Sequence, residues 1–581
     1  MRFFWRFLIA LWIPCLAFAA PGISEEDGIR RVQAHLLLED HDSALREAQE
    51  LYESFPQSRA VGAAYIEALA SSGFEANALQ AWNRLSLKYP DLVQDRQLLE
   101  ELSWGILRKG IESNQYAIRL SALIGAYLTR DVRAVKMLVR MMRDSNAVVR
   151  SVAVQMAAGF ADAPLKDEIT RLMAEEKIWF TRLEVIKAAG ALRMKELAPQ
   201  LQAIVSSEKN TYEERQIAIT ALVAIYDRIT AEEIRKMTES SRAGIRHLAC
   251  QLASHFQVKE ARDDIVRLVS DSNPDVRVAA INAIGLVYLP DIEKEKLQEI
   301  VKIRLDDANP AVAITAAWAA ALIDPPMSES AFSRWIFGDL PEYRRLAAGA
   351  LAASGGRCVE LGKRVLNESK DPYVRVNVAL GLIGQRVEVK RCCDTIYEFL
   401  MNEKRMWMWD NRANSLFQVL APSQVRHNDQ IPNYPEAMDQ MTRLNLVSVM
   451  AMVEDSRAQE ALKSFLQKKT WGITGVAAAM LLQEGDSGAL DVVRSLLEDN
   501  DPNVRLQACL VLSLMGHGES VVFDLQKAYV YSDHERKLHI LEAIGHIGSA
   551  ESLPFLVGVL EEPFQVLRVA AASCLIQSLN K

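Results

Sequence analysis

Histidine and carboxylate residues come first among the side chains of this 581-residue chain that could do chemistry. His534 and Glu535 are adjacent, and imidazole and carboxylate groups are common ligands of catalytic metals. His539 and His546 are seven residues apart, which places them on one face of a helix. No acid or cysteine completes either group at ligand spacing. We therefore expect solvated or packed histidines rather than a metal site.

Cysteine is the second candidate, and six cysteines follow residue 20. Their spacing fits no disulfide or zinc framework. Cys250 and Cys509 lie four residues after an arginine, where a repeated pattern needs a small buried hydrophobe. The adjacent pair Cys392 and Cys393 would strain the peptide if it bonded to itself. We expect packed free thiols. Glycine-rich phosphate loops and hydrolase motifs are also missing, so the sequence predicts no catalytic, cofactor-binding or metal residues.

The charge balance and the first residues limit the function classes. The formal net charge of -8 argues against nucleic-acid binding, since neutralising phosphates needs a basic surface. The chain begins MRFFWRFLIALWIPCLAFAA, which has two arginines, an apolar run and small residues before a cut after Ala19. This pattern predicts a signal peptide over residues 1–19 and export to the periplasm or the outside. An uncleaved anchor in the inner membrane and a lipid-modified Cys15 are the alternatives.

A repeated line dominates the rest of the chain. Residues 271–287 read DSNPDVRVAAINAIGLV, and residues 499–516 carry the same line. The arginine slot returns at steps of 30 to 37 residues, at Arg119, Arg150, Arg182, Arg215, Arg246, Arg277, Ala313, Arg345, Arg375, Arg412, Arg443, Thr474, Arg505, Lys537 and Arg568. Each unit predicts an amphipathic helix, a turn and a more buried second helix, which neighbouring units must cover.

These units resemble HEAT repeats of the short type also found in phycobilin lyases. The resemblance covers about residues 110–578, and it rests on an acid six residues before the arginine and a proline three before it. In that family the acid and the arginine commonly form a ladder between neighbouring repeats. The resemblance therefore implies an inter-repeat ladder that includes Asp144, Arg150, Asp271, Arg277, Asp499 and Arg505.

Residues 24–90 follow a different period. Ala44, Leu51 and Pro56 recur 34 residues later as Ala78, Leu85 and Pro90. This step resembles the tetratricopeptide repeat, although Val32 and Ile66 fill the slot where that repeat usually has glycine. We expect an all-α protein. Its parts are the signal peptide, a tetratricopeptide-like cap over 20–110 and, over 111–581, a right-handed α-solenoid of about fifteen two-helix HEAT-like repeats.

Enzymes occur among the families that this chain resembles. Deoxyhypusine hydroxylases hold two irons with several His-Glu pairs, whereas this chain has one such pair, His534-Glu535. Phycobilin lyases have no single certifying motif, and an exported protein is an unusual place for their chemistry. The prediction is therefore a non-enzymatic exported scaffold or adaptor that binds a protein partner without a cofactor. A lyase or metal-dependent enzyme and a membrane-anchored envelope assembly factor are the alternatives.

Two places interrupt the regular pattern in ways that suit a protein partner. Around residues 386–440 the step lengthens to 37, and RMWMWDNR is followed by a segment with Pro432 and Pro435. Exposed aromatic and methionine side chains favour recognition, and the alternative is that Trp407 and Trp409 fill a gap left by the missing helix. The candidates are Met406, Trp407, Met408, Trp409 and Tyr434.

The second place is a basic helix face over residues 129–144, with Arg133, Lys136 and Arg140 as candidate residues for an acidic partner. A solvated face is the alternative. The last unit, residues 567–580, has no polar capping repeat after it. Such an uncapped apolar face favours a partner or self-association.

Overall fold

The computed structural model describes residues 24–401, 407–410, 416–422, 434–458, 460–461, 493–514 and 516–581. The predicted signal peptide lies outside these residues. The chain divides into unit 1, residues 1–109, and unit 2, residues 110–581. Among the helices searched in the described residues, none combines the length and the apolar character that a bilayer crossing requires.

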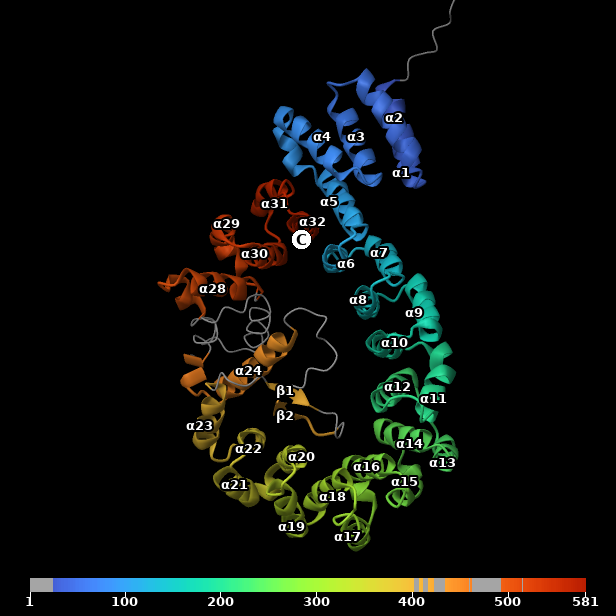
Figure 1. The fold of residues 1–581 in the computed structure, drawn as a ribbon, viewed down its shortest axis with the longest axis vertical. Helices are drawn as coiled ribbons and strands as arrows, with labels where there is room; N and C mark the ends of the chain where they lie inside the picture. Colours follow the sequence, from blue (N-terminus) through green and yellow to red (C-terminus); the bar gives the residue numbers. More distant parts are fainter. Residues whose placement is uncertain are drawn as a thin grey trace, which may run out of the picture. The chain divides into compact units, whose positions relative to one another are not determined.

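Unit 1 consists of two helix pairs and most of a fifth helix (Figure 1). α1 (Glu25–Leu37) and α3 (Arg59–Ser71) begin and end 34 residues apart, and so do α2 (His41–Ser54) and α4 (Glu75–Lys88). α5 (Arg96–Ile111) follows and runs across the boundary into unit 2. Ser24, Asp40 and Ser58 cap three of these helices by accepting a hydrogen bond from a backbone N–H of the first turn.

The close approach within each pair depends on a glycine that the sequence pattern did not single out. A Cβ on Gly28 would lie 2.5 Å from the side chain of Leu51, and one on Gly62 would lie 2.8 Å from Leu85. Val32 and Ile66, which fill the slot where the tetratricopeptide repeat usually has glycine, are both buried core residues. The second contact repeats the first 34 residues later, since Gly62 follows Gly28 and Leu85 follows Leu51 by that step.

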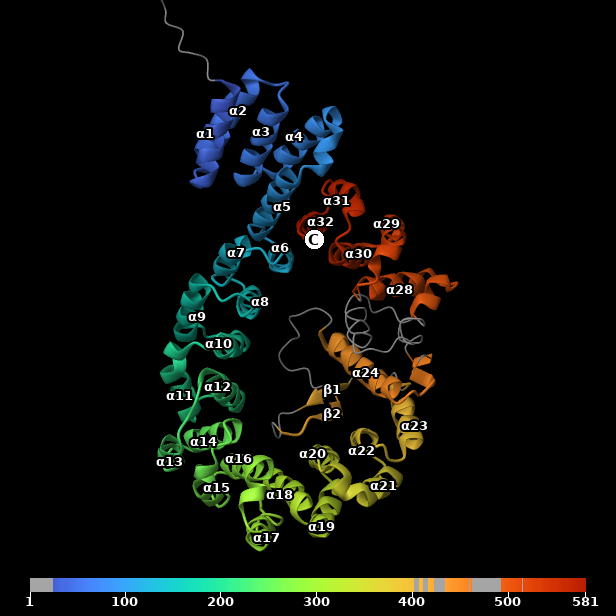
Figure 2. The ribbon, with the colours of Figure 1, turned by 180° about the vertical axis from the view of Figure 1, so that it is seen from behind.

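Unit 2 is a solenoid of helix pairs in two layers (Figures 1 and 2). The first-helix layer holds α7 (Arg133–Met141), α9 (Ala163–Glu175), α11 (Ala198–Ser206), α13 (Ala231–Thr238), α15 (Arg262–Leu268), α17 (Lys294–Lys302), α19 (Pro325–Ile336), α21 (Val359–Glu368), α23 (Val389–Leu400), α29 (Val522–Tyr531) and α31 (Leu553–Val559). The second-helix layer holds α6 (Tyr116–Leu128), α8 (Ala147–Ala157), α10 (Trp179–Ala191), α12 (Tyr212–Ile225), α14 (Ala243–His255), α16 (Pro274–Ala283), α18 (Pro310–Ile323), α20 (Pro341–Ala352), α22 (Pro372–Gly384), α24 (Tyr434–Met452), α28 (Pro502–Leu514), α30 (His534–Ile547) and α32 (Gln565–Leu579).

The repeated line builds the turn between the two helices of a unit. In the unit of α16, Asp271 accepts a hydrogen bond from the backbone N–H of Asn273 at 2.8 Å. Asn273 in turn caps α16, and Pro274 occupies its first position, where no N–H is needed. The Arg277 side chain then donates back to the carbonyl of Asp271 at 2.9 Å. The side chains of Asp271, Asn273 and Arg277 thus satisfy backbone groups that the turn would otherwise leave without a partner.

The last helix of unit 2 packs against the first. The side chain of Ser573 in α32 donates to the backbone carbonyl of Gly125 in α6 at 2.8 Å, across 448 residues of sequence. At the end of α5, Gly110 lies close to both Ala122 of α6 and Val569 of α32. The uncapped face predicted for the last unit is therefore corrected, because α6 of the same chain covers it. Self-association through that face loses its physical basis.

A β-hairpin interrupts the otherwise helical array within the irregular unit. β1 (Trp407–Asp410) pairs antiparallel with β2 (Val419–Pro422), and Trp409 stands opposite Leu420. The expected fold class, an α-solenoid of helical repeats, holds for unit 2, with this hairpin as the departure from an all-α chain. The hairpin contacts α20, α22 and α24, so it lies on the second-helix layer (Figure 1).

Candidate functional site

The candidate metal residues do not come together. His534 and Glu535 open α30 on exposed positions, and the His534 ring packs 3.9 Å from the Phe564 ring centroid. His539 contacts Glu542 of its own helix at 3.3 Å, whereas His546 is exposed. Within the described residues, no group of three His, Cys, Asp or Glu side chains could hold a metal ion.

The six cysteines after residue 20 are buried and free of disulfides. Burial raises the pKa of the Cys392 thiol to about 12 and that of Cys393 to about 11. The same cause raises the pKa of Cys250, Cys509 and Cys574. These thiols are therefore protonated at neutral pH, and a protonated buried thiol is a poor nucleophile. This agrees with the packed thiols expected from the sequence.

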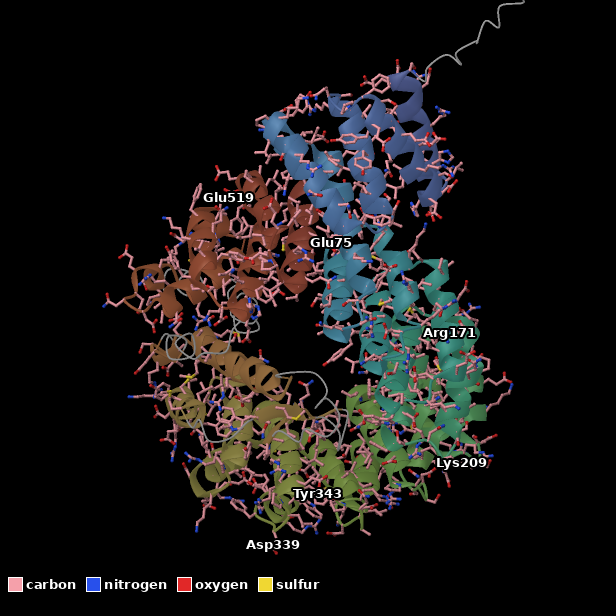
Figure 3. All side chains as sticks on the ribbon, turned by 45° about the horizontal axis from the view of Figure 1, so that its top comes forward. Glu75, Arg171, Lys209, Asp339, Tyr343 and Glu519 are labelled. Carbon is pink, nitrogen blue, oxygen red and sulfur yellow. The ribbon has the colours of Figure 1, made fainter. Side chains whose placement is uncertain are left out.

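The arginine ladder is the most regular polar feature of unit 2. Arg119 donates to both carboxylate oxygens of Asp144 at 2.7 and 2.8 Å, and Arg150 does the same to Glu176. Further rungs join Arg182 to Glu214, Arg246 to Asp271, Arg277 to Asp307, Arg344 to Asp371 and Lys537 to Glu562. Each rung ties one repeat to the next along the turns. Figure 3 labels two residues of such turns, Lys209 and Asp339.

The ladder residues implied by the family resemblance occupy this feature with two differences. Asp499 and Arg505 share a turn, where Arg505 donates to the backbone carbonyls of Asp499 and Asn500. The repeat before them falls largely outside the described residues. The slot assigned to Arg345 belongs to Arg344, because Arg344 makes the rung with Asp371 and Arg345 lies over the Tyr373 ring instead. The one-residue error follows from the unequal repeat spacing there.

We expect the ladder to make unit 2 acid-sensitive. Burial tends to raise the pKa of Asp271, but hydrogen bonds from Arg246 and the Asn273 amide outweigh it and hold the pKa below 3.8. The stabilisation is therefore complete above that ordinary value and is lost as pH falls through the lower folded pKa. Asp271→Asn is expected to lower the free energy of unfolding by about 1.5–3 kcal/mol at pH 7. The difference from wild type should shrink at pH 3.

Urea unfolding of both proteins at the two pH values measures this. Asp263→Asn is the matched control, since Asp263 pairs with Arg262 on an exposed surface. Its effect should stay within about 0.5 kcal/mol. An Asp271→Asn deficit of the same size at pH 3 as at pH 7 would contradict the assignment of the effect to the ionised carboxylate.

The basic helix face of α7 is largely neutralised by neighbouring acids. Arg133 pairs with Asp131 at 2.7 Å, and Arg140 pairs with Glu112 at 3.1 Å. Arg143 pairs with Glu168, which is buried. Lys136 is exposed. A stripe paired in this way offers a weaker field to an acidic partner than the sequence suggested, and the solvated face is the better interpretation.

The aromatic candidates do not form an exposed patch. Trp407 is fully buried, stacks on Phe399 at 3.8 Å between ring centroids, and has the Arg443 guanidinium 3.9 Å from its ring. Its proposed role in partner recognition is corrected, because the ring fills the space beside α23. Met408 and Trp409 are half-buried in β1. Met406 and the side chain of Tyr434 lie outside the described part of the structure.

The hairpin reveals what the second-helix layer can bind. Asn377 of α22 accepts a hydrogen bond from the Leu420 N–H at 2.8 Å and donates to the Leu420 carbonyl at 3.1 Å. Val419 packs over Gly349 of α20, where a Cβ would lie 2.4 Å from the Val419 methyl group. Phe417 meets the Trp318 ring of α18 edge to face at 5.6 Å. A side-chain amide, a glycine cradle and an aromatic contact thus hold one extended segment.

The face of the second-helix layer that the hairpin covers extends over earlier repeats, where the hairpin does not cover it. Trp318 and Gly349 stand five positions after the ladder slots Ala313 and Arg344, and the hairpin covers both. Five positions after Arg150, Arg182, Arg215 and Arg246 the side chains are polar, and three of the four are exposed while the last is half-buried: Gln155, Lys187, Thr220 and Gln251. We call these four residues the open strip. It runs over α8, α10, α12 and α14.

Comparison with known proteins adds a local family match. Residues 490–576 match the family model of HEAT repeats. No curated protein matches the chain. Kap121p bound to Nup53p is 10% identical with a TM-score of 0.33, over 94% of this chain and 82% of that one. The UNC-45 chaperone is 11% identical (TM-score 0.31, 91% and 72% covered). Human deoxyhypusine hydroxylase with glycerol is 15% identical (TM-score 0.21, 44% and 96%). Likeness at these scores supports no functional conclusion.

Proposed function

We propose that this protein is a non-enzymatic, exported scaffold that binds an extended segment of a protein partner along the open strip of the second-helix layer. The observation that supports this proposal is that the Asn377 side chain hydrogen-bonds to both the N–H and the carbonyl of Leu420. A layer that holds its own extended segment through side chain–backbone hydrogen bonds offers the same chemistry to another chain. Export rests on residues 1–19, which lie outside the described residues.

The open strip is suited to such a segment. Gln155 and Gln251 carry side-chain amides, which can both donate and accept as Asn377 does. The strip crosses four successive repeats, and repeat proteins bind extended partners on surfaces of this kind. The polar character of the strip favours hydrogen bonds to a backbone over burial of an apolar helix.

Site-specific photo-crosslinking tests the proposal. A crosslinking residue at Lys187 or Thr220 is expected to capture one partner in cells, and the captured segment is identified by mass spectrometry. The same residue at Lys302, which is exposed in α17 of the first-helix layer, is the matched control and should capture none of it. A synthetic peptide of the captured segment must then bind the purified protein. Equal capture from both layers, or a peptide that does not bind, would reject the function.

A further inference from the structure

The ladder position of Arg215 lacks its carboxylate. Arg182 pairs with Glu214 and Arg246 pairs with Asp271, but Arg215 between them donates only to the backbone carbonyl of Asn210 at 2.6 Å. Within the described residues no carboxylate lies within ion-pair distance of Arg215. The cause is visible in the sequence. The residue six positions before the next ladder arginine is Ser240, where the equivalent of Asp271 would stand.

Ser240 keeps the backbone role of the acid and loses its charge. The Ser240 hydroxyl accepts a hydrogen bond from the N–H of Arg242 at 3.2 Å, as the Asp271 carboxylate does from Asn273 at 2.8 Å. Its carbonyl accepts from Arg246 at 2.8 Å, as the carbonyl of Asp271 accepts from Arg277. The turn is therefore intact, and only the side chain that would reach Arg215 is too short.

A pocket of about 310 Å³ opens at this rung. The end of α11 and the starts of α12, α14 and α16 line it, and Arg215 and Gln216 face it. Its wall is tightly built, because a Cβ on Gly244 would lie 2.0 Å from the carbonyl oxygen of Val205. Gln216 lines the pocket, and Thr220 of the open strip follows it by one helical turn on the same side of α12. The pocket therefore lies between Arg215 and the open strip.

The Arg215 guanidinium, which has no ion-pair partner among the described residues, suits one carboxylate. Arg215 and Arg242 are positive, whereas Glu208 and Asp275 are negative, and Asp275 interacts electrostatically with Arg215 beyond ion-pair distance. His247 is buried there, and burial lowers its pKa to about 4, so the ring is neutral at pH 7. A doubly charged phosphate would meet repulsion from Asp275 and Glu208, and a cation would meet the two arginines. A single carboxylate matches the planar guanidinium as at the other rungs.

We infer that this pocket binds an aspartate or glutamate side chain of the partner's extended segment, which completes the ladder at Arg215. The inference rests on the proposed function and names the class of partner, an acidic segment. The partner carboxylate takes the position that Asp271 occupies beside Arg246, and the segment continues along α12 and α14 over the open strip.

Ser240→Asp tests the inference by supplying the missing carboxylate from the chain itself. The probe is a fluorescein-labelled, end-blocked peptide of alternating glutamate and alanine, followed by fluorescence anisotropy. Wild-type protein should bind it, and both Ser240→Asp and Arg215→Gln should weaken binding at least tenfold. Ser240→Asp should also raise the melting temperature, since it adds a rung. Ser272→Asp places the same charge in the next turn, whose rung Asp271 already fills, and should bind as wild type.

Each other outcome overturns the inference. A glutamine–alanine peptide that binds as tightly as the glutamate peptide would remove the carboxylate from recognition. Unchanged binding by Ser240→Asp would place the acidic segment elsewhere. Free glutarate competing at the concentration of the peptide would indicate a small-molecule carboxylate site instead. These failures leave crosslinking at Lys187 and Thr220 intact, whereas loss of the crosslinks rejects the proposed function itself.

Discussion

Deletion of residues 565–581 is expected to expose the amides of α6 to hydrogen exchange, although α6 lies 448 residues away at the Gly125–Ser573 contact. The deletion removes α32, whose buried side chains include Leu567, Val569 and Leu575. Burial of one such side chain contributes about 1.5–3 kcal/mol. Loss of several such contacts should accelerate exchange in α6 at least a hundredfold through local opening.

The control for this experiment is α10, which is separated from α32 by α6 and α8. Stability in a repeat array is dominated by contacts between neighbours, so exchange in α10 should change little. Mass-resolved exchange of peptides from 116–128 and 179–191 measures both helices in one sample. Unchanged protection of α6 in the deletion variant would contradict the packing of the last helix on the first.

The packing of α32 on α6 explains why the sequence of the last repeat looks uncapped. A solenoid with free ends needs polar capping repeats, because each end otherwise exposes an apolar face. Here Ala571 and Ala572 of α32 are fully buried, and so are Leu123 and Ala126 of α6. Two ends that cover each other need no caps. Sequence reasoning missed this, since a small buried residue looks the same whether the neighbouring repeat is adjacent in sequence or far away.

Local signals predicted the repeat well because each one acts within a few residues. The line DSNPDVR specifies a turn through bonds between residues two to six positions apart, so its period revealed the helix pairs. The missing rung could also have been found, since Ser240 breaks a pattern that is visible in the sequence. The rung itself crosses 25 to 32 residues, and only the structure assigns Arg182 to Glu214.

The hairpin shows where sequence reasoning failed. The run WMWD is, from the sequence, either a recognition surface before a repeat helix or a set of side chains that fill the gap left by a missing helix. In the structure it pairs with residues 419–422, and Trp407 faces inward. The alternation of two tryptophans is the period of a strand, which was the available signal. The buried residues that bond to the hairpin, Asn377 and Asp439, are 43 and 32 residues from Leu420 and Trp407, so no local pattern in the sequence indicated these bonds.

Removal of Asp439 is expected to release the hairpin. Asp439 accepts hydrogen bonds from the Trp407 N–H and from Nε of Arg443, both at 2.7 Å, and Arg443 also donates to the Leu400 carbonyl. All of these groups are buried. Asp439→Ala therefore leaves the guanidinium in a low-dielectric site without this carboxylate, which costs about 3–5 kcal/mol. Exchange of the β1 amides should rise accordingly, and Trp318 beneath the hairpin should become accessible to solvent quenchers.

A matched comparison separates the buried charge from a general loss of an acid. Asp394→Ala removes a half-exposed partner of Arg457 at 2.7 Å and should cost at most about 1 kcal/mol. Combining Asp439→Leu with Arg443→Met should recover much of the loss, because no charge then remains to be buried. Hydrogen exchange of β1 and α24 measures all three variants. Equal small losses for Asp439→Ala and Asp394→Ala would mean that the Asp439–Arg443 pair does not anchor the hairpin. A double variant as unstable as Asp439→Ala would assign the loss to the Trp407 N–H bond instead.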